Sequence, residues 1–287
     1  MVSGLEAGHG KYRGVTALVL TSLLWGTSFP VIKVVVTDVS EFTYTWLRSL
    51  VAVAGLLPYL MYYLRRHGSL SSETVKGGLL AGLAYALGLW LQGWGTRYTT
   101  ASNSAFITGL NVVFVHLYVG VVKKSYSPYL GLALAFSVAG LYMITAPSTG
   151  FNVGDFLVLL SSVLWAAQVI LVSRYCRGDP IIFTLFEMLP AVSFIVPDLI
   201  SGSVGPIRCD LLLLIAYLGL VCSDAAFTLQ VLGQRYVSAA VAAIIFLLEP
   251  VFAAVFAHLL ISEFMSMQQV IGATLILAAM LVASVKS

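Results

Sequence analysis

Two carboxylic acids interrupt apolar stretches of the sequence. Glu249 stands near the centre of the stretch 238–260 and precedes Pro250, which removes one backbone hydrogen bond from a helix. Asp224 lies past the middle of the stretch 211–232, with Thr228 four residues later. A charge at mid-bilayer costs about 2.5–3.5 kcal/mol on insertion scales, so such groups face a partner or a wet cavity. We therefore interpret Glu249, with Asp224 second, as a candidate proton- or cation-responsive site beside a helix break at Pro250.

Both acids also have a structural interpretation. A protonated Glu249 could bond to a neighbouring helix and hold a kink, and Asp224 could bond locally to Ser or Thr hydroxyl groups. The sequence leaves these alternatives open.

Three further ionisable residues lie nearer the ends of apolar stretches. Lys33 and Arg48 are expected in the outer third of the membrane, in the orientation derived below, where long side chains can extend outward. Their acidic partners would be Asp38, Glu41 or Glu263. The alternative is an outer gate, or a contact with a solute carboxylate. Glu187 is expected in the inner third, where it would pair with Arg174, Arg177 or Arg235. Its alternative role is an inner gate, or an ion pair that depends on conformation.

Aromatic and amide side chains at mid-depth predict a central cavity. Trp25 and Trp165 fall in the middle of their stretches, although tryptophan is more common at membrane interfaces. In helical geometry Ser28 shares a face with Trp25, and Gln168 shares one with Trp165. The candidate cavity residues are Trp25, Ser28, Tyr85, Trp90, Gln92, Asn103, Asn111, Trp165 and Gln168. The alternative is helix packing through polar contacts, each worth about 0.6 kcal/mol on average.

Motifs for several other chemistries are missing from the sequence. It has no G-x-x-x-x-G-K-[ST] loop, no H-E-x-x-H and no G-x-S-x-G, so ATP-driven pumping would need a separate subunit. The three cysteines lack metal-ligand spacing, and His116 and His258 are expected to pack inside helices. No selectivity loop typical of an ion channel is evident. We therefore predict no catalytic residue, no metal and no cofactor, and the net charge of +3 does not suggest a nucleic-acid partner.

The elements that carry these residues are predicted to be membrane-spanning helices. The chain has 287 residues, of which 60% are hydrophobic and 9% charged, whereas soluble domains carry about 25% charged residues. A spanning helix needs about 20 mostly apolar residues. Ten stretches qualify: 14–36, 43–64, 75–95, 101–122, 128–146, 154–174, 181–201, 211–232, 238–260 and 267–285. The fold class is therefore an all-α membrane protein with ten transmembrane helices.

The basic residues predict the orientation of these helices. Lys and Arg are enriched in cytoplasmic loops. With the N-terminus inside, the inner segments hold Lys11, Arg13, Arg65, Arg66, Lys76, Lys123, Lys124, Arg174, Arg177, Arg235 and Lys286. The outer loops hold only Arg97 and Arg208. Both termini are therefore expected in the cytoplasm.

The second half of the chain echoes the first. Leu24-Trp25 recurs as Leu164-Trp165, and Gly95-x-Arg97-Tyr98 recurs as Gly233-x-Arg235-Tyr236, at offsets of 140 and 138 residues. Five helices in each half is an odd number, so the second copy must cross the membrane in the opposite sense. We therefore predict two inverted repeats, residues 1–147 and 148–287, an arrangement that permits alternating access.

The sequence also resembles the EamA-type family of the drug/metabolite transporter superfamily. The resemblance rests on Leu23-Leu24-Trp25-Gly26-Thr27-Ser28-Phe29 with Lys33 and Arg48, and on Leu247-Leu248-Glu249-Pro250-Val251-Phe252 with Glu263, Gln269, Ile271-Gly272-Ala273 and Leu275-Ile276. It implies ten helices, two inverted repeats and a central cavity for metabolite export or exchange. One departure is Asn111-Val112, which aligns with Glu249-Pro250 and is followed by Lys123-Lys124. The first copy is therefore expected to lack the carboxylate and the helix break of the second.

These features together predict a secondary carrier in the cell membrane. It would move a small organic metabolite, such as an amino acid, by alternating access, in export or exchange. The expected partners are the lipid bilayer and the solute, and the protein would be a monomer or a homodimer. Two alternatives are an intramembrane enzyme acting on a lipid or peptide, with Asp224 and Glu249 as its only candidate pair, and a receptor or scaffold that transports nothing.

Overall fold

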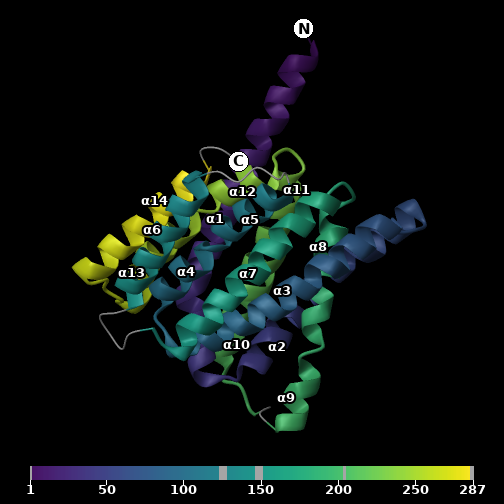
Figure 1. Cartoon of the computed structure of the whole chain (residues 1–287). Helices are drawn as coiled ribbons and strands as arrows, with labels where there is room; N and C mark the ends of the chain where they lie inside the picture. Colours follow the sequence, from purple (N-terminus) through teal and green to yellow (C-terminus); the bar gives the residue numbers. More distant parts are fainter. Residues whose placement is uncertain (1, 123–127, 146–150, 203–204, 285–287) are drawn as a thin grey trace.

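The computed structural model describes residues 2–122, 128–145, 151–202 and 205–284, and within these ranges the only regular structure is helical. In chain order the helices are α1 (Val2–Asp38), α2 (Glu41–His67), α3 (Ser72–Tyr98), α4 (Ala101–Gly109), α5 (Asn111–Val122), α6 (Pro128–Thr145), α7 (Val153–Tyr175), α8 (Pro180–Val192), α9 (Ile195–Ser201), α10 (Cys209–Tyr217), the π-helix η1 (Leu218–Ala225), α11 (Ala226–Gln234), α12 (Ala239–Ile245), α13 (Leu248–Ile261) and α14 (Met267–Ser284). Figure 1 shows them as one bundle.

Eight helical segments of the described chain are long and apolar enough to cross a membrane. They are Gly10–Asp38, Glu41–His67, Ser72–Tyr98, Ala101–Val122, Val153–Tyr175, Pro180–Ser201, Cys209–Gln234 and Ala239–Ile261. The fifth and tenth predicted spans correspond to α6 and α14, whose apolar segments Gly131–Gly140 and Met267–Ala279 are shorter. Ten spans therefore stay a prediction.

Four of the eight segments are not continuous α-helices. The fourth is interrupted at Leu110, between α4 and α5, and the eighth at Phe246 and Leu247, between α12 and α13. The break in the fourth corrects the expectation that only the second copy has one. It needs no proline: Gly109 is a weak helix former, and the amide of Leu110 turns back to the carbonyl of Ile107 at 3.1 Å. The other two are the sixth, split into α8 and α9, and the seventh, which contains η1.

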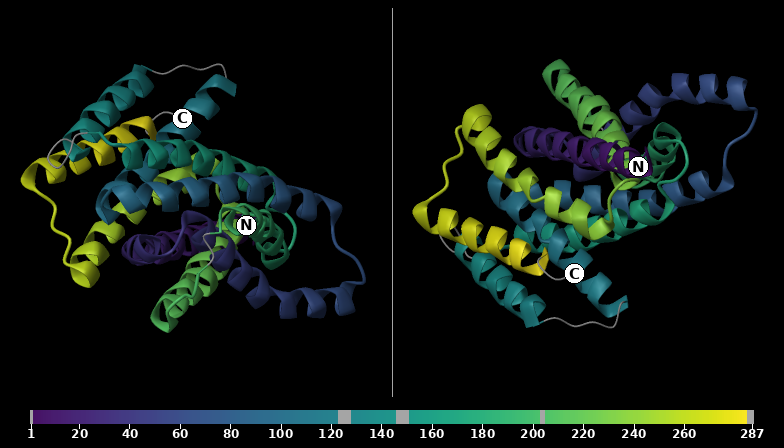
Figure 2. Two further views of the ribbon diagram at one scale, coloured as in Figure 1. Left: turned by 90° about the horizontal axis from the view of Figure 1, so that it is seen from below. Right: turned by 90° about the horizontal axis from the view of Figure 1, so that it is seen from above.

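The two halves pack against each other through corresponding helices. α3 of the first half packs on α7, and α11 of the second half packs on α1. In the same way α4 and α5 contact α7, while α13 contacts α1. α6 and α14 lie side by side at one edge of the bundle (Figure 2). The helices that carry the cavity residues are thus held mainly by contacts between halves.

Glycines make two of these contacts possible. A Cβ atom on Gly95 of α3 would lie 2.6 Å from the carbonyl oxygen of Gly154 in α7. A Cβ atom on Gly233 of α11 would lie 2.9 Å from the carbonyl oxygen of Gly14 in α1. Backbones approach this closely only where side chains are absent. Because the two pairs are separated by 140 and 138 residues, the same close contact occurs at both interfaces.

α2 and α8 run antiparallel. Ser40 at the start of α2 donates a hydrogen bond to Asp198, in the helix that follows α8, at 2.8 Å. Tyr59, late in α2, donates to Asp179 at the start of α8, also at 2.8 Å. Both residues of one pair lie 139 positions from those of the other, Ser40 from Asp179 and Tyr59 from Asp198. The contact therefore repeats at both ends of the helix pair.

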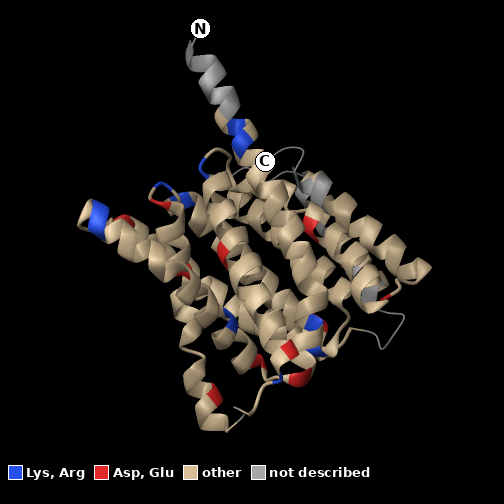
Figure 3. Ribbon diagram, turned by 180° about the vertical axis from the view of Figure 1, so that it is seen from behind, with Lys and Arg blue, Asp and Glu red and all other residues tan. Residues whose placement is uncertain are grey.

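The start of α1 and the end of α14 lie at the same end of the bundle, which we call the terminal end (Figure 1). The opposite end, the distal end, carries residues 39–40, 99–100, 205–208 and 262–266. Figure 3 shows Lys and Arg along the terminal end, whereas acidic residues are more frequent at the distal end and in the middle. This distribution agrees with a cytoplasmic terminal end, which stays a prediction.

The glycine contacts generate a stability prediction. Replacing Gly95 with Ala should destabilise the fold by about 1–3 kcal/mol, because the added methyl overpacks the contact with Gly154. Gly233→Ala should have a similar effect at the corresponding interface. Thermal unfolding in detergent measures both. Gly205→Ala is the matched control, because nothing lies within 4 Å of the added atom. Equal melting temperatures for all three variants would contradict the close packing.

Candidate functional site

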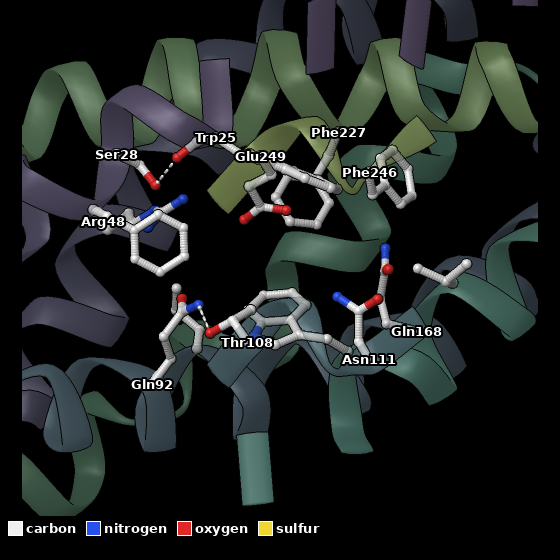
Figure 4. Close-up of a pocket in the computed structure, with 14 residues that line it drawn as sticks. Trp25, Ser28, Arg48, Gln92, Thr108, Asn111, Gln168, Phe227, Phe246 and Glu249 are labelled. Carbon is white, nitrogen blue, oxygen red and sulfur yellow. Dashed lines mark hydrogen bonds between the residues drawn. The ribbon is translucent and has the colours of Figure 1, made fainter. Parts of the chain in front are cut away.

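A narrow cavity of about 30 Å³ lies inside the bundle. Both halves of the chain line it. Its lining residues are Trp25, Ser28, Phe29, Arg48, Leu89, Gln92, Thr108, Asn111, Trp165, Gln168, Val169, Phe227, Phe246 and Glu249. Figure 4 shows their side chains converging from several helices on a common space.

The structure brings together most of the residues selected from the sequence. Trp25, Ser28, Gln92, Asn111, Trp165, Gln168 and Glu249 all line the cavity, and so does Arg48. Three cavity candidates lie elsewhere. Tyr85 is buried behind the wall against Trp165, Trp90 stacks on Phe42 and Trp94, and Asn103 accepts a hydrogen bond from Gln269. These contacts hold the three side chains outside the cavity lining.

Aromatic rings form one wall of the cavity. The ring of Trp25 lies 4.9 Å from that of Phe227 and 5.2 Å from that of Phe246. Trp165 lies 6.1 Å from Phe227. Such tilted arrangements fix the rings against one another. They present apolar faces and ring electrons to the cavity.

Arg48 is the cationic group of the cavity, and its side chain is only 3% exposed. Its Nε donates to Ser223 at 2.9 Å, and its Nη1 donates to the hydroxyl of Tyr44, one turn earlier, at 2.7 Å. The expected outward extension to an acidic partner is therefore wrong. The side chain points to the interior because two buried hydroxyl groups hold it there, and depth alone does not reveal direction.

The π-helix η1 supplies one hydrogen-bond acceptor for Arg48 and another for Trp25. Its residue Ser223 holds Arg48, and the carbonyl of Cys222 accepts a hydrogen bond from the indole nitrogen of Trp25 at 3.2 Å. A π-turn shifts the backbone hydrogen-bond register, and such turns are frequent at functional sites. η1 therefore positions both a charged and an aromatic group of the cavity wall.

Glu249 is the acidic group of the cavity and is 6% exposed. It lies in the first turn of α13, directly after the break at Phe246 and Leu247, and its amide bonds to the carbonyl of Phe246 at 3.0 Å. Pro250 follows within the same turn, where its missing N–H removes no helical bond. The carboxylate points into the cavity (Figure 4), and no ion pair joins it to the described residues.

A chain of buried amides extends behind the cavity. Gln168 donates to Glu187 at 2.6 Å and exchanges two hydrogen bonds of 3.0 Å with Gln230. Glu187 is fully buried, and its second carboxylate oxygen has no partner among the described residues. The expected ion pair with an arginine is therefore wrong. Glu187 accepts a hydrogen bond from Gln168 instead, because both side chains face the interior.

The other two charged candidates lie outside the cavity lining. Asp224 lies in η1, 8% exposed, and one of its carboxylate oxygens has no partner in the described chain. Lys33 donates to the carbonyls of Thr96, Arg97 and Thr99, at 3.1, 2.9 and 2.8 Å, rather than to an acid. It binds the end of α3, where helix carbonyls attract cations.

Comparison with known sequences decides the family. The model of the EamA-like transporter family matches residues 12–146 and, a second time, residues 152–285. The chain belongs to the EamA-like transporter family.

Similar proteins carry consistent descriptions. An uncharacterized transporter of Archaeoglobus fulgidus is 30% identical to this EamA-like protein over 274 residues, 94% of this chain and 85% of the relative. A second uncharacterized transporter of that organism is 26% identical over 279 residues, 94% and 96% of the two chains. The uncharacterized transporter YyaM of Bacillus subtilis is 27% identical over 204 residues, 66% of each. A solved structure described only as a crystal structure of a protein has a TM-score of 0.68 at 16% identity, covering 94% of this chain and 96% of that one, which speaks for the fold alone.

The family and the apolar helices establish the broad class of this protein. It is a multi-pass integral membrane protein and a membrane transporter. These findings point to a transporter rather than an enzyme.

Several cavity residues of this EamA-like transporter were not selected from its sequence. They are Phe29, Leu89, Thr108, Val169, Phe227 and Phe246. Five of them are apolar residues within apolar helices and carry no distinguishing signal, and the sixth is Thr108. The repeat offers one for Phe246, which lies 138 positions after Thr108, so equivalent positions of the two halves both line the cavity.

The amide chain generates a second prediction. Gln168→Leu should destabilise the protein by about 1–3 kcal/mol for each buried group left unpaired, namely Gln230 and Glu187. The double variant Gln168→Leu with Gln230→Leu should lose less than the sum of the two single losses, because the two amides bond to each other. Thermal unfolding in detergent of the four proteins checks this. Strictly additive losses would show that the two amides do not interact.

Proposed function

We propose that this EamA-like transporter is a secondary carrier that moves a small organic solute, such as an amino acid, across the cell membrane by alternating access. Its two halves, residues 1–147 and 148–287, act as inverted repeats around the cavity, and the direction of net transport is export or exchange. The observation that carries the proposal is one buried cavity lined by both halves and holding both an arginine and a glutamate.

Three observations support the inverted repeat. α2 and α8 run antiparallel with corresponding bonds at both ends. Corresponding glycine pairs join α3 to α7 and α11 to α1. The two helix breaks, at Leu110 and at Phe246–Leu247, fall at nearly equivalent positions of the halves. Such a pair of halves can rock about a fixed central site and open it to either side.

The cavity chemistry favours a solute with two charged ends and an apolar body. The guanidinium of Arg48 matches a carboxylate, and the carboxylate of Glu249 matches an ammonium group. No ion pair between them exists in the structure, so both are available to a solute. The rings of Trp25 and Trp165 would contact its apolar part.

Glu249 is also the acid that we expect to respond to protons or cations. It lies in the cavity, next to a helix break, so its charge state affects both solute and backbone. Asp224 stays a second candidate. The enzyme alternative needs these two acids as a pair, but only Glu249 is among the cavity residues. No described feature favours a receptor or scaffold over a carrier.

A ligand screen tests the carrier. Amino acids, nucleotides, sugars and amphiphilic cations are added to the purified protein. A solute that binds the folded state at a concentration of 100 Kd raises the free energy of unfolding by about 2.7 kcal/mol, and the melting temperature rises with it. The response should disappear in Trp165→Ala and Glu249→Gln. Uptake of the labelled solute into liposomes, with and without a pH gradient, then measures transport. A protein that binds and moves none of these solutes would contradict the proposal.

Three phenyl compounds test the two charged contacts separately. L-phenylalanine carries both charges, 3-phenylpropanoate only the carboxylate and 2-phenylethylamine only the ammonium group. Arg48→Gln should weaken binding of the first two compounds about tenfold or more, because a charged hydrogen bond is lost, and spare the third. Glu249→Gln should spare only 3-phenylpropanoate.

Thermal shifts and competition binding measure these affinities, and each variant is the control for the other. If Arg48→Gln weakened all three compounds equally, its effect would be structural. If none of the three stabilised the wild-type protein, a two-charged aromatic solute would be excluded.

A further inference from the structure

Three acidic side chains of the second half reach the first half at the distal end, and two of them contact the start of a helix. They are Asp155, Asp198 and Glu263. None belongs to the cavity lining, and the solute-binding role proposed above does not account for their bonds to the first half, although Asp155 also forms the capping box of α7 with Asn152. Helix starts carry unpaired N–H groups and a partial positive charge, which carboxylates stabilise.

Asp198 binds the start of α2. It is fully buried, and it accepts hydrogen bonds from the hydroxyl groups of Ser40 and Thr43, at 2.8 and 2.5 Å. The indole nitrogen of Trp46 donates a third bond at 2.7 Å. Ser40 is itself the N-cap of α2. Asp198 thus joins α9 to the first turn of a helix in the other half.

Glu263 binds the start of α4, and Asp155 binds Thr99, the residue that caps the end of α3. The two carboxylate oxygens of Glu263, in the connection between α13 and α14, accept from the amides of Ala101 and Ser102 at 2.9 and 2.8 Å. Asp155 accepts from the hydroxyl of Thr99 at 2.7 Å. Hydrogen bonds to charged groups are roughly twice as strong as neutral ones. Both carboxylates therefore tie the connection between α3 and α4 to the second half.

The part of the first half that contacts these carboxylates is held together by hydrogen bonds within that half. Lys33 of α1 binds the carbonyls of Thr96, Arg97 and Thr99 at the end of α3. In return, Arg97 binds the carbonyl of Val36 near the end of α1 at 2.7 Å. These bonds stay inside one half, so they survive a movement of the halves, whereas the three carboxylate contacts cross between the halves.

Within the described residues, the terminal end has a repeat equivalent of only one of these contacts, the bond between Ser40 and Asp198. The counterparts of Asp198 and Asp155, at offsets of 139 and 140, are Tyr59 and Val15. Glu263 corresponds to the sequence at 123–125, which is Lys-Lys-Ser. In the described chain, the contact across the halves that involves a carboxylate at the terminal end is the bond from Tyr59 to Asp179. The distal end has three bonds to Asp198, two to Glu263 and one to Asp155.

We propose that Asp155, Asp198 and Glu263 form a one-sided latch that holds the distal end closed, so that the resting transporter opens its cavity toward the terminal end. The inference rests on the proposed alternating access. Contacts present in only one of two conformations shift the population toward it. With the termini in the cytoplasm, the resting carrier loads solute from the cytoplasm, as export requires.

Thiol labelling of the full-length protein in vesicles, without solute, tests the latch. Val169→Cys places a thiol in the cavity lining, and Cys209→Ser removes the exposed natural thiol. A membrane-impermeant maleimide is applied from either side. The orientation of the protein in the vesicles is measured with the protein that keeps Cys209. Because Cys209 lies at the distal end, the side from which it is labelled is the distal side. The cavity thiol should react faster from the terminal side. In Asp198→Asn with Glu263→Gln, labelling from the distal side should rise about tenfold, a shift of about 1.4 kcal/mol.

Two control variants sharpen the result. Tyr59→Phe removes the bond at the terminal end and should not raise distal labelling. Arg208→Ala removes an exposed ion pair with Asp38 at the distal end and should change little, because exposed pairs contribute little. Labelling of Cys176, which is 3% exposed, identifies unfolding as the cause of any increase.

Two outcomes would overturn the latch. One is unchanged distal labelling in a double variant that is still folded, and the other is a wild-type cavity thiol that reacts faster from the distal side. Where the double variant does not fold, Asp155→Asn alone must raise distal labelling. Because no solute is present, a labelling shift in a protein that transports nothing would remove the carrier proposal and leave the latch.

Discussion

Hydrocarbon offers no hydrogen bonds, so helix breaks and buried helix ends in this fold must find their partners within the protein. The two halves solve this problem alike. Arg97, in the last turn of α3, donates to the carbonyl of Val36 at the end of α1. Arg235, the C-cap residue of α11, donates to the carbonyl of Cys176 at the end of α7. Both distances are 2.7 Å. The donors are 138 residues apart and the acceptors 140. This shared task explains why Gly-x-Arg-Tyr is still recognisable in both copies.

The same constraint explains where the cavity lies. Irregular backbone at membrane depth is tolerated only inside protein or beside water. Here both breaks border the cavity, with Thr108 and Asn111 on either side of the break at Leu110, and Phe246 and Glu249 at the other. A break frees backbone groups and redirects the chain, and it therefore brings polar side chains to a common space that straight helices would leave packed.

The sequence predicted the helical class and most of the polar cavity residues, because apolar length and mid-depth position are one-dimensional properties. Direction was harder to predict. Arg48 was expected to extend outward, but Tyr44 and Ser223 turn it inward, and Ser223 comes from a helix 175 residues away. Glu187 was assigned an arginine and binds an amide. A side chain's bonding partner depends on tertiary packing, which spacing along one helix does not encode.

Duplication followed by divergence can build a site with direction on a symmetric frame. Arg48 corresponds to Glu187 and Glu249 corresponds to Asn111, at offsets of 139 and 138. Arg48 and Glu249 line the cavity, whereas Glu187 lies behind it against Gln168. The cation of the cavity thus comes from one half and the acid from the other. Two identical halves would present two charges of the same sign to a solute. The repulsion between these two charges would oppose their burial. Unequal halves avoid that cost, and under the proposed carrier mechanism they would define which end of a two-charged solute faces which half.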